Sequence, residues 1–161
     1  MENMQRAAEL AGEMIAQAVQ WVSEGTAGPF LAYLGASDSR VTLVDLSQGG
    51  DQSPLDYGRG LMVVRSAARG VIVYDGTISN SDGELYAALI GKAYEFQHGE
   101  GTFDVFVPYR PARRAQSFGV YALVLDDQDG QPVSDEILDA FLEGTRRDAE
   151  VGEFLRQHQL Q

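Results

Sequence analysis

The strongest constraint on the fold is a run of β-type segments between about Phe30 and Asp126, with an amphipathic helical segment before it and another after it. The segments are rich in β-branched and aromatic residues, and turns rich in glycine and aspartate separate them, as is typical of antiparallel strands. A block of strands flanked by helices indicates the α+β class. We therefore predict a single α+β domain over residues 1–161, with one meander-like antiparallel sheet of about six or seven strands.

The segment before the strands, residues 3–24, is the clearest predicted helix, because its apolar residues recur at the spacing of one helix face. Gly25 follows it as a stop signal. Leu10, Met14 and Trp21 widen the apolar stripe. Two interpretations stay open: the helix packs on the sheet of its own chain, or the extra apolar edge meets a second subunit.

The predicted strands are bounded by turn signals and cover residues 30–35, 40–46, 61–67, 71–78, 85–97, 102–109 and 117–125. Residues 85–97 also fit a helix, since Ser81 and Glu84 have the spacing of a capping box. We prefer a strand there, because glycine turns lie on both sides of the segment. Between the second and third strands, residues 47–60 form a predicted loop of 14 residues, a length typical of loops that are either functional or mobile.

Two helical segments are predicted after the strands, the first beginning at Ser134 and the second covering residues 146–158, with Gly144 as a break or bend between them. Ser134 is a suitable N-cap, and Asp135 and Glu136 stand where the helix dipole favours acidic residues. We expect the N-terminal and C-terminal helices to pack on one face of the sheet and the other face to be wetter.

Charge and composition limit the partners of this chain. It carries 12 basic and 24 acidic residues, a formal net charge of −12, and no cysteine. A chain this acidic repels the phosphates of nucleic acids and of anionic membranes, so we expect neither as a partner. The lack of cysteine excludes disulfides and cysteine-based metal sites. Since the sequence holds no recognisable signal peptide or membrane span, we expect a cytoplasmic protein.

No pattern in the sequence predicts a catalytic centre, a metal site or a cofactor. Residues 127–136 resemble part of a calcium-binding loop, but Leu125 stands where the first oxygen ligand is required, so we predict a polar turn. The two histidines, His98 and His158, are far apart in the sequence and are predicted to be surface residues.

One carboxylate stands out because Asp75 follows the apolar stretch Val71–Tyr74. A buried carboxylate there would need a partner, for which Arg65 and Arg69 are the nearest candidates. An exposed aspartate at a strand end is the alternative.

The candidate ligand site is a basic cluster beside a tyrosine, formed by Tyr109, Arg110, Arg113 and Arg114. Arginine side chains bind carboxylates and phosphates through two parallel hydrogen bonds, so this cluster could receive an anion or an acidic partner. The alternatives are ion pairs with the chain's own acids, or a solvated turn.

Two functional hypotheses follow. The first is a non-enzymatic interaction module for a basic partner protein, similar in its overall character to bacterial secretion chaperones, immunity proteins and adaptors. The alternative is a protein that binds an anion or a metabolite, or a minor enzyme, with a pocket on the sheet lined by some of the strand tyrosines Tyr33, Tyr74, Tyr86, Tyr94, Tyr109 and Tyr121. An uncovered strand edge at residues 61–67 would also favour a homodimer.

Overall fold

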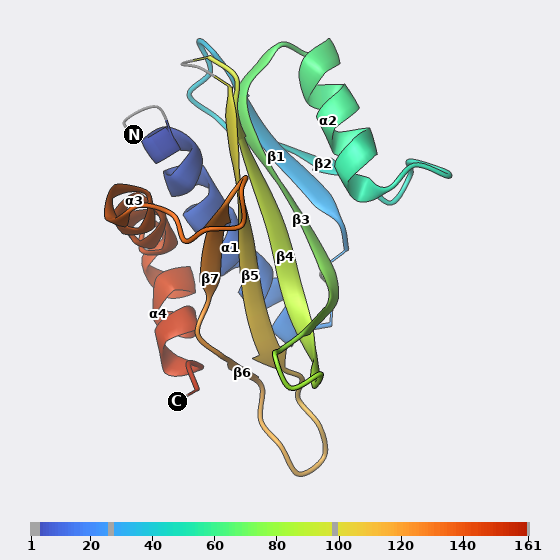
Figure 1. The fold of residues 1–161 in the computed structure, drawn as a ribbon, viewed down its shortest axis with the longest axis vertical. Coiled ribbons are helices and arrows are strands. Elements are labelled where there is room, and N and C mark those ends of the chain that lie inside the picture. Colours follow the sequence, from blue (N-terminus) through green and yellow to red (C-terminus); the bar gives the residue numbers. More distant parts are fainter. Residues whose placement is uncertain (1–3, 26–27, 98–99, 161) are drawn as a thin grey trace.

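The computed structural model describes residues 4–25, 28–97 and 100–160 (Figure 1). Its helices are α1 (Gln5–Ser23), α2 (Pro54–Val64), α3 (Asp135–Thr145) and α4 (Ala149–Gln157). Its strands are β1 (Phe30–Gly35), β2 (Thr42–Asp45), β3 (Ala67–Ser79), β4 (Leu85–Glu95), β5 (Gly101–Arg110), β6 (Gly119–Val120) and β7 (Val124–Asp127). They form one antiparallel seven-stranded sheet in the order β2-β1-β3-β4-β5-β6, with β7 also paired to β5. The α+β fold with helices at both ends is therefore confirmed.

The segment that fitted both a helix and a strand is a strand. β4 pairs with β3 from Leu85 to Glu95, and with β5 along most of the same length. The turn before it depends on Asn80, whose side-chain oxygen accepts hydrogen bonds from the backbone N–H groups of Asp82 and Glu84, both at 2.9 Å. Gly83 adopts a φ of +80°, which favours glycine. These contacts close a hairpin where a capping box would have started a helix.

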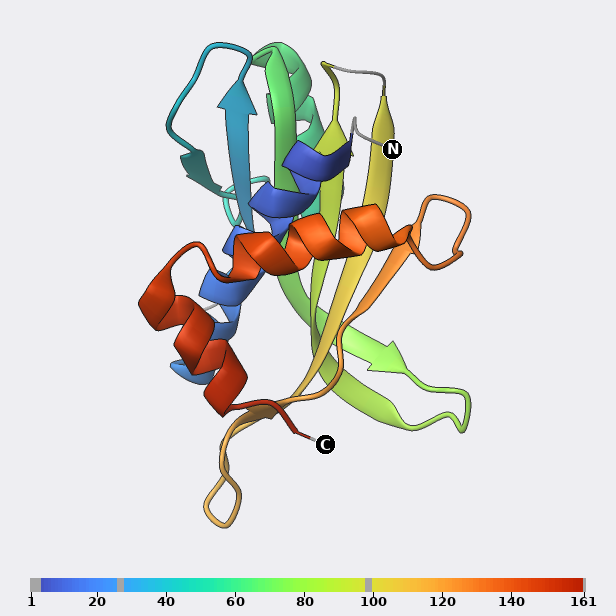
Figure 2. The same cartoon turned by 90° about the vertical axis from the view of Figure 1, so that its left-hand side faces the viewer.

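Helices stacked in two levels cover one face of the sheet (Figure 2). α1 packs directly on β3 and β4, and α3 crosses α1 on the side away from the sheet (Figure 2). The crossing is very close: a Cβ atom added at Gly12 would lie 2.0 Å from the carbonyl oxygen of Phe141, and one at Gly144 would lie 2.1 Å from that of Glu9. The apolar stripe of α1 is wide because it meets the sheet on one side and α3 on the other.

The C-terminal helices begin at two side-chain caps. Ser134 Oγ accepts a hydrogen bond from the backbone N–H of Ile137 at 3.3 Å, which confirms the predicted N-cap. Asp148 Oδ1 accepts from the N–H groups of Glu150 and Val151, so α4 begins three residues later than predicted. The predicted strand over residues 117–125 is divided into β6 and β7.

Residues 47–53 lie in a loop as predicted, but the prediction for residues 54–64 was wrong, because they form the helix α2 where we predicted the rest of the loop and then a strand. Ser53 caps this helix, with its Oγ accepting a hydrogen bond from the backbone N–H of Asp56 at 3.1 Å, and Pro54 occupies the first turn. The argument for a homodimer through an edge at residues 61–67 therefore fails. The strands at the ends of the sheet order are β2 and β6.

α2 lies on the face opposite the other helices and covers part of it (Figure 1). Met62 of α2 is fully buried. A Cβ atom added at Gly58 would lie 2.6 Å from Ile72 Cδ1, so the glycine lets the helix approach the sheet. The second apolar core built there contains Leu31, Tyr33, Leu46, Met62, Ala67, Ile72 and Tyr94. This part of the second face is therefore dry, contrary to our expectation.

Candidate functional site

No described helix lies over the remaining part of the second face (Figure 1), whose strands carry several apolar residues. Its central row crosses four strands in register: Tyr74 of β3 faces Ile90 of β4, Ile90 faces Phe106 of β5, and Phe106 faces Val124 of β7. Ile90, Phe106 and Val124 belong to neither of the two apolar cores. We define the open sheet face as this row together with the neighbouring residues Ile78, Tyr86, Pro108 and Tyr121.

Contacts among its own residues hold the open sheet face in shape. A Cβ atom added at Gly76 would lie 2.8 Å from Ile90 Cδ1, so the glycine leaves the space that Ile90 occupies. Tyr86 and Tyr121 pack edge to face, with ring centroids 5.6 Å apart and planes at 77°. Val124 is the most exposed member of the central row, at 46%. A surface whose side chains are already held in place loses less conformational entropy when it binds a partner.

An acidic fringe separates the open sheet face from the part under α2. The register places Lys92, Asp104 and Asp126 in the next row across β4, β5 and β7. Lys92 Nζ lies 3.9 Å from Asp104 Oδ1. Burial raises the pKa of Asp104, the charge of Asp126 raises it further, and Lys92 opposes both effects. Burial also raises the pKa of Tyr74, to which the charge of Asp104 contributes. Two carboxylates against one ammonium leave the fringe negative.

Replacing Asp104 with asparagine is expected to stabilise the isolated protein at neutral pH. Because folding raises the pKa of this carboxyl, its charge costs stability at a pH above both its unfolded and its folded value. The cost develops as the pH rises from the ordinary value, 3.8, to the raised folded value, and it is absent below both. We expect thermal unfolding at pH 7 to show a Tm gain of about 1–2 °C that shrinks as the pH falls toward 4.

The matched control for this prediction is Asp82→Asn, which removes the same charge from an exposed hairpin turn. Its Tm should stay close to that of the wild type at every pH. A lower Tm for Asp104→Asn at pH 7 would contradict the prediction, because it would mean that the attraction of Lys92 outweighs the burial of the carboxylate.

The ligand site predicted at Tyr109, Arg110, Arg113 and Arg114 does not converge on one point. Tyr109 is buried on the helix-covered face, and Arg110 projects on the other because neighbouring strand residues alternate. Arg110 donates from Nε to the carbonyl oxygen of Ser117 at 3.0 Å. Arg113 and Arg114 are exposed in the β5–β6 loop, and none of the three arginines forms an ion pair with another described residue. A ligand site there stays a prediction.

Asp75 has a partner that we did not predict. The hydroxyl of Tyr109 lies 2.7 and 2.9 Å from its two carboxylate oxygens and donates to them. Burial raises the pKa of Tyr109, and the hydrogen bond and the charge of Asp75 raise it further. Arg65 instead donates to the hydroxyl of Tyr33 at 3.0 Å, and Arg69 pairs with Glu95. The arginines that are nearest in sequence are thus engaged elsewhere.

The turn that resembled part of a calcium loop is closed by its own backbone. Asp127 Oδ1 accepts hydrogen bonds from the N–H groups of Asp129 and Gln131, at 2.9 and 3.0 Å. Within residues 4–25, 28–97 and 100–160, no three histidine, aspartate or glutamate side chains gather as a metal ion would require. No helix in these same ranges is long and apolar enough to cross a membrane.

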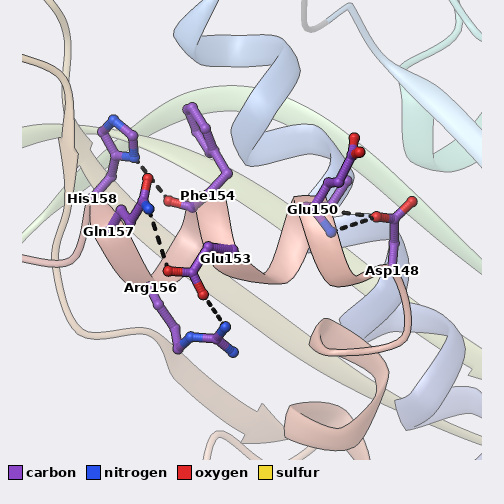
Figure 3. A network of polar contacts seen from close by, with 8 residues as sticks. Asp148, Glu150, Glu153, Phe154, Arg156, Gln157 and His158 are labelled. Carbon is purple, nitrogen blue, oxygen red and sulfur yellow. Dashed lines mark hydrogen bonds and ion pairs between the residues drawn. The ribbon is translucent and has the colours of Figure 1, made fainter.

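Of the two histidines, His158 is among the described residues and His98 is not. His158 is half-buried rather than a surface residue: its Nδ1 donates to the carbonyl oxygen of Phe154 at 2.8 Å, and the two rings stack with centroids 4.1 Å apart (Figure 3). It therefore closes the end of α4. His98 lies outside the described residues, so the prediction that it is a surface residue stays open.

Only a partial signal in the sequence points to the open sheet face. Val105, Phe106 and Val107 are consecutive apolar residues, and a strand with this pattern is apolar on both of its faces. The six strand tyrosines, considered together as pocket candidates, fall into three groups: Tyr33 and Tyr94 near α2, Tyr109 on the helix-covered face, and Tyr74, Tyr86 and Tyr121 on the open sheet face.

Comparisons with known proteins identify no relative of this chain. No protein-family model, no curated protein and no solved structure matches the chain.

Proposed function

We propose that the protein is a non-enzymatic interaction module that binds a partner polypeptide on the open sheet face, as a chaperone, an immunity protein or an adaptor does. The observation that supports this proposal best is the continuous row of Tyr74, Ile90, Phe106 and Val124, of which the last three belong to neither apolar core. Aromatic side chains in well-packed, desolvated positions are among the groups that supply most of the binding energy at protein interfaces.

The expected partner is a polypeptide segment with apolar side chains beside positive charges. Asp104 and Asp126 fringe the open sheet face, and burial disfavours the charged form of Asp104 by more than the nearby Lys92 offsets. A basic group of the partner would lower the pKa of Asp104 and recover that cost. A second copy of this chain fits less well, because two molecules of net charge −12 repel one another.

The binding surface can be tested with a random peptide library displayed on phage, selected against the wild-type protein. We expect the selected peptides to combine aromatic or aliphatic residues with arginine or lysine. Synthetic copies should bind the Phe106→Ser variant at least about tenfold more weakly in fluorescence anisotropy, since truncating a hot-spot residue at the centre of an interface costs about 2 kcal/mol or more. Their affinity should also fall as salt is raised.

The control variant is Val64→Ser, because Val64 is 82% exposed but lies on α2, away from the open sheet face. It should bind the selected peptides as the wild type does. Circular dichroism and Tm establish that both variants are folded. Selected peptides that are acidic, or that bind Phe106→Ser as tightly as the wild type, would refute the proposal. A dimer in analytical ultracentrifugation that Phe106→Ser dissociates would identify a second copy as the occupant instead.

A further inference from the structure

A cavity on the helix-covered side of the sheet collects arginines from four separate parts of the chain. Its volume is about 590 Å³, and its lining includes Arg6 of α1, Arg40 of the β1–β2 loop, Arg69 of β3 and Arg147 of the α3–α4 link. Known small-molecule pockets occupy about 300–1,000 Å³, so a metabolite-sized compound fits a cavity of this volume. The α1 helix and the α3–α4 link that contribute to it are seen from their outer side in Figure 2.

Two of the four arginines are held in place by acidic partners. Arg69 is 6% exposed, and its Nε donates to Glu95 Oε1 at 2.9 Å. Arg147 lies 3.0 Å from a carboxylate oxygen of Glu9 and 3.7 Å from one of Glu13. These three carboxylates and four guanidinium groups leave one net positive charge, in a chain whose total is −12.

The other two arginines are available to a ligand. Arg6 and Arg40 are exposed, and within the described part of the chain neither forms an ion pair, although the chain has 24 acidic residues. Long cationic side chains that no carboxylate holds can turn toward an anion that enters the cavity. Leu10, Leu34 and Val41 supply an apolar wall beside them.

We propose that this cavity, the four-arginine cavity, binds a small organic anion that carries phosphate or several carboxylate groups on a partly apolar body. Arg6 and Arg40 contact the anionic group, because the planar guanidinium group matches the geometry of both phosphate and carboxylate oxygens. Arg69 and Arg147 provide fixed positive charge, and the apolar wall contacts the rest of the ligand. This site lies on the opposite side of the sheet from the open sheet face, so it is independent of the binding of a partner protein.

The test measures thermal unfolding at constant ionic strength with inorganic pyrophosphate and, separately, with citrate as the probe. The wild-type Tm should rise with probe concentration, because a ligand that binds only the folded state stabilises it. The variant Arg6→Gln/Arg40→Gln should lose most of this rise, and its dissociation constant in calorimetry should be at least about tenfold larger. A rise with pyrophosphate alone assigns the site to phosphate groups, and a rise with citrate alone assigns it to carboxylates.

The matched control is Arg113→Gln/Arg114→Gln, which removes two exposed arginines from the β5–β6 loop. It should keep the full response to the probe. The proposal is overturned if neither anion shifts the wild-type Tm at millimolar concentration, or if the Arg6→Gln/Arg40→Gln variant responds as the wild type does. A response that is lost only in the control would place anion binding in the loop, at the site predicted from the sequence.

Discussion

Replacing Gly12 with alanine is expected to lower the free energy of unfolding by about 3 kcal/mol. The new Cβ atom would lie 2.0 Å from the carbonyl oxygen of Phe141, a backbone atom that moves only if α3 moves. The two helices must therefore separate and lose part of the packing between them. Alanine's higher helix propensity recovers about 1 kcal/mol at most. Urea unfolding followed by circular dichroism measures the difference.

The chain offers two informative comparisons for this substitution. Gly60 lies in α2 with nothing within 4 Å of an added Cβ atom, so Gly60→Ala should stabilise the protein by up to about 1 kcal/mol. Gly144→Ala forces the same two helices apart and should be as harmful as Gly12→Ala. Because one separation relieves both clashes, the double variant should lose less than the sum of the two. A neutral Gly12→Ala would mean that α1 and α3 are not in backbone contact.

Replacing Glu95 with alanine is expected to cost about 3–5 kcal/mol of stability. Glu95 is 1% exposed, and its carboxylate accepts hydrogen bonds from Arg69 Nε at 2.9 Å and from the backbone N–H of Gln97 at 3.1 Å. Without the Glu95 carboxylate, the positive charge of Arg69 stays buried with no negative charge opposite it. A buried charge of this kind is strongly destabilising. Chemical denaturation of the variant, with the wild type alongside, gives the free energy.

A surface pair and a double substitution show whether the cost comes from burial. Glu153 pairs with Arg156 on the exposed side of α4, and Glu153→Ala should leave the stability close to that of the wild type (Figure 3). Removing both buried charges in Arg69→Met/Glu95→Leu should recover most of the loss, since apolar side chains of similar size often replace a buried pair without penalty. A loss in the double variant as large as in Glu95→Ala would contradict this explanation.

Local sequence signals were sufficient to predict turns and helix caps, whose structure depends on a few neighbouring residues. The turn around Gly83 and the cap at Ser134 both lie where the sequence predicts them, because each depends on contacts within a few residues. α2 was missed although Ser53 and Pro54 are good start signals. Its glycines and its two consecutive valines have low helix propensity, and burial of Met62 against the sheet overrides that preference.

The candidate sites depend on distances that a sequence does not contain. Phe106 lies on a strand that is apolar on both faces. Whether its side chain is covered depends on how much of the second face α2 covers. The four-arginine cavity draws its arginines from positions 6, 40, 69 and 147, which no motif connects. The basic cluster at residues 110–114 is adjacent in sequence, but strand alternation and a loop spread its side chains apart.

The crossing of α1 by α3 also determines when this chain can finish folding during its synthesis. Arg147 donates a hydrogen bond to Glu9 across 138 positions of sequence, so α1 must wait for a contact with a segment that leaves the ribosome much later. Contacts at such separation form slowly, because a long loop must close first. Until then the nascent chain exposes the apolar side of α1 that α3 will cover, and it depends on its own negative charge to stay in solution.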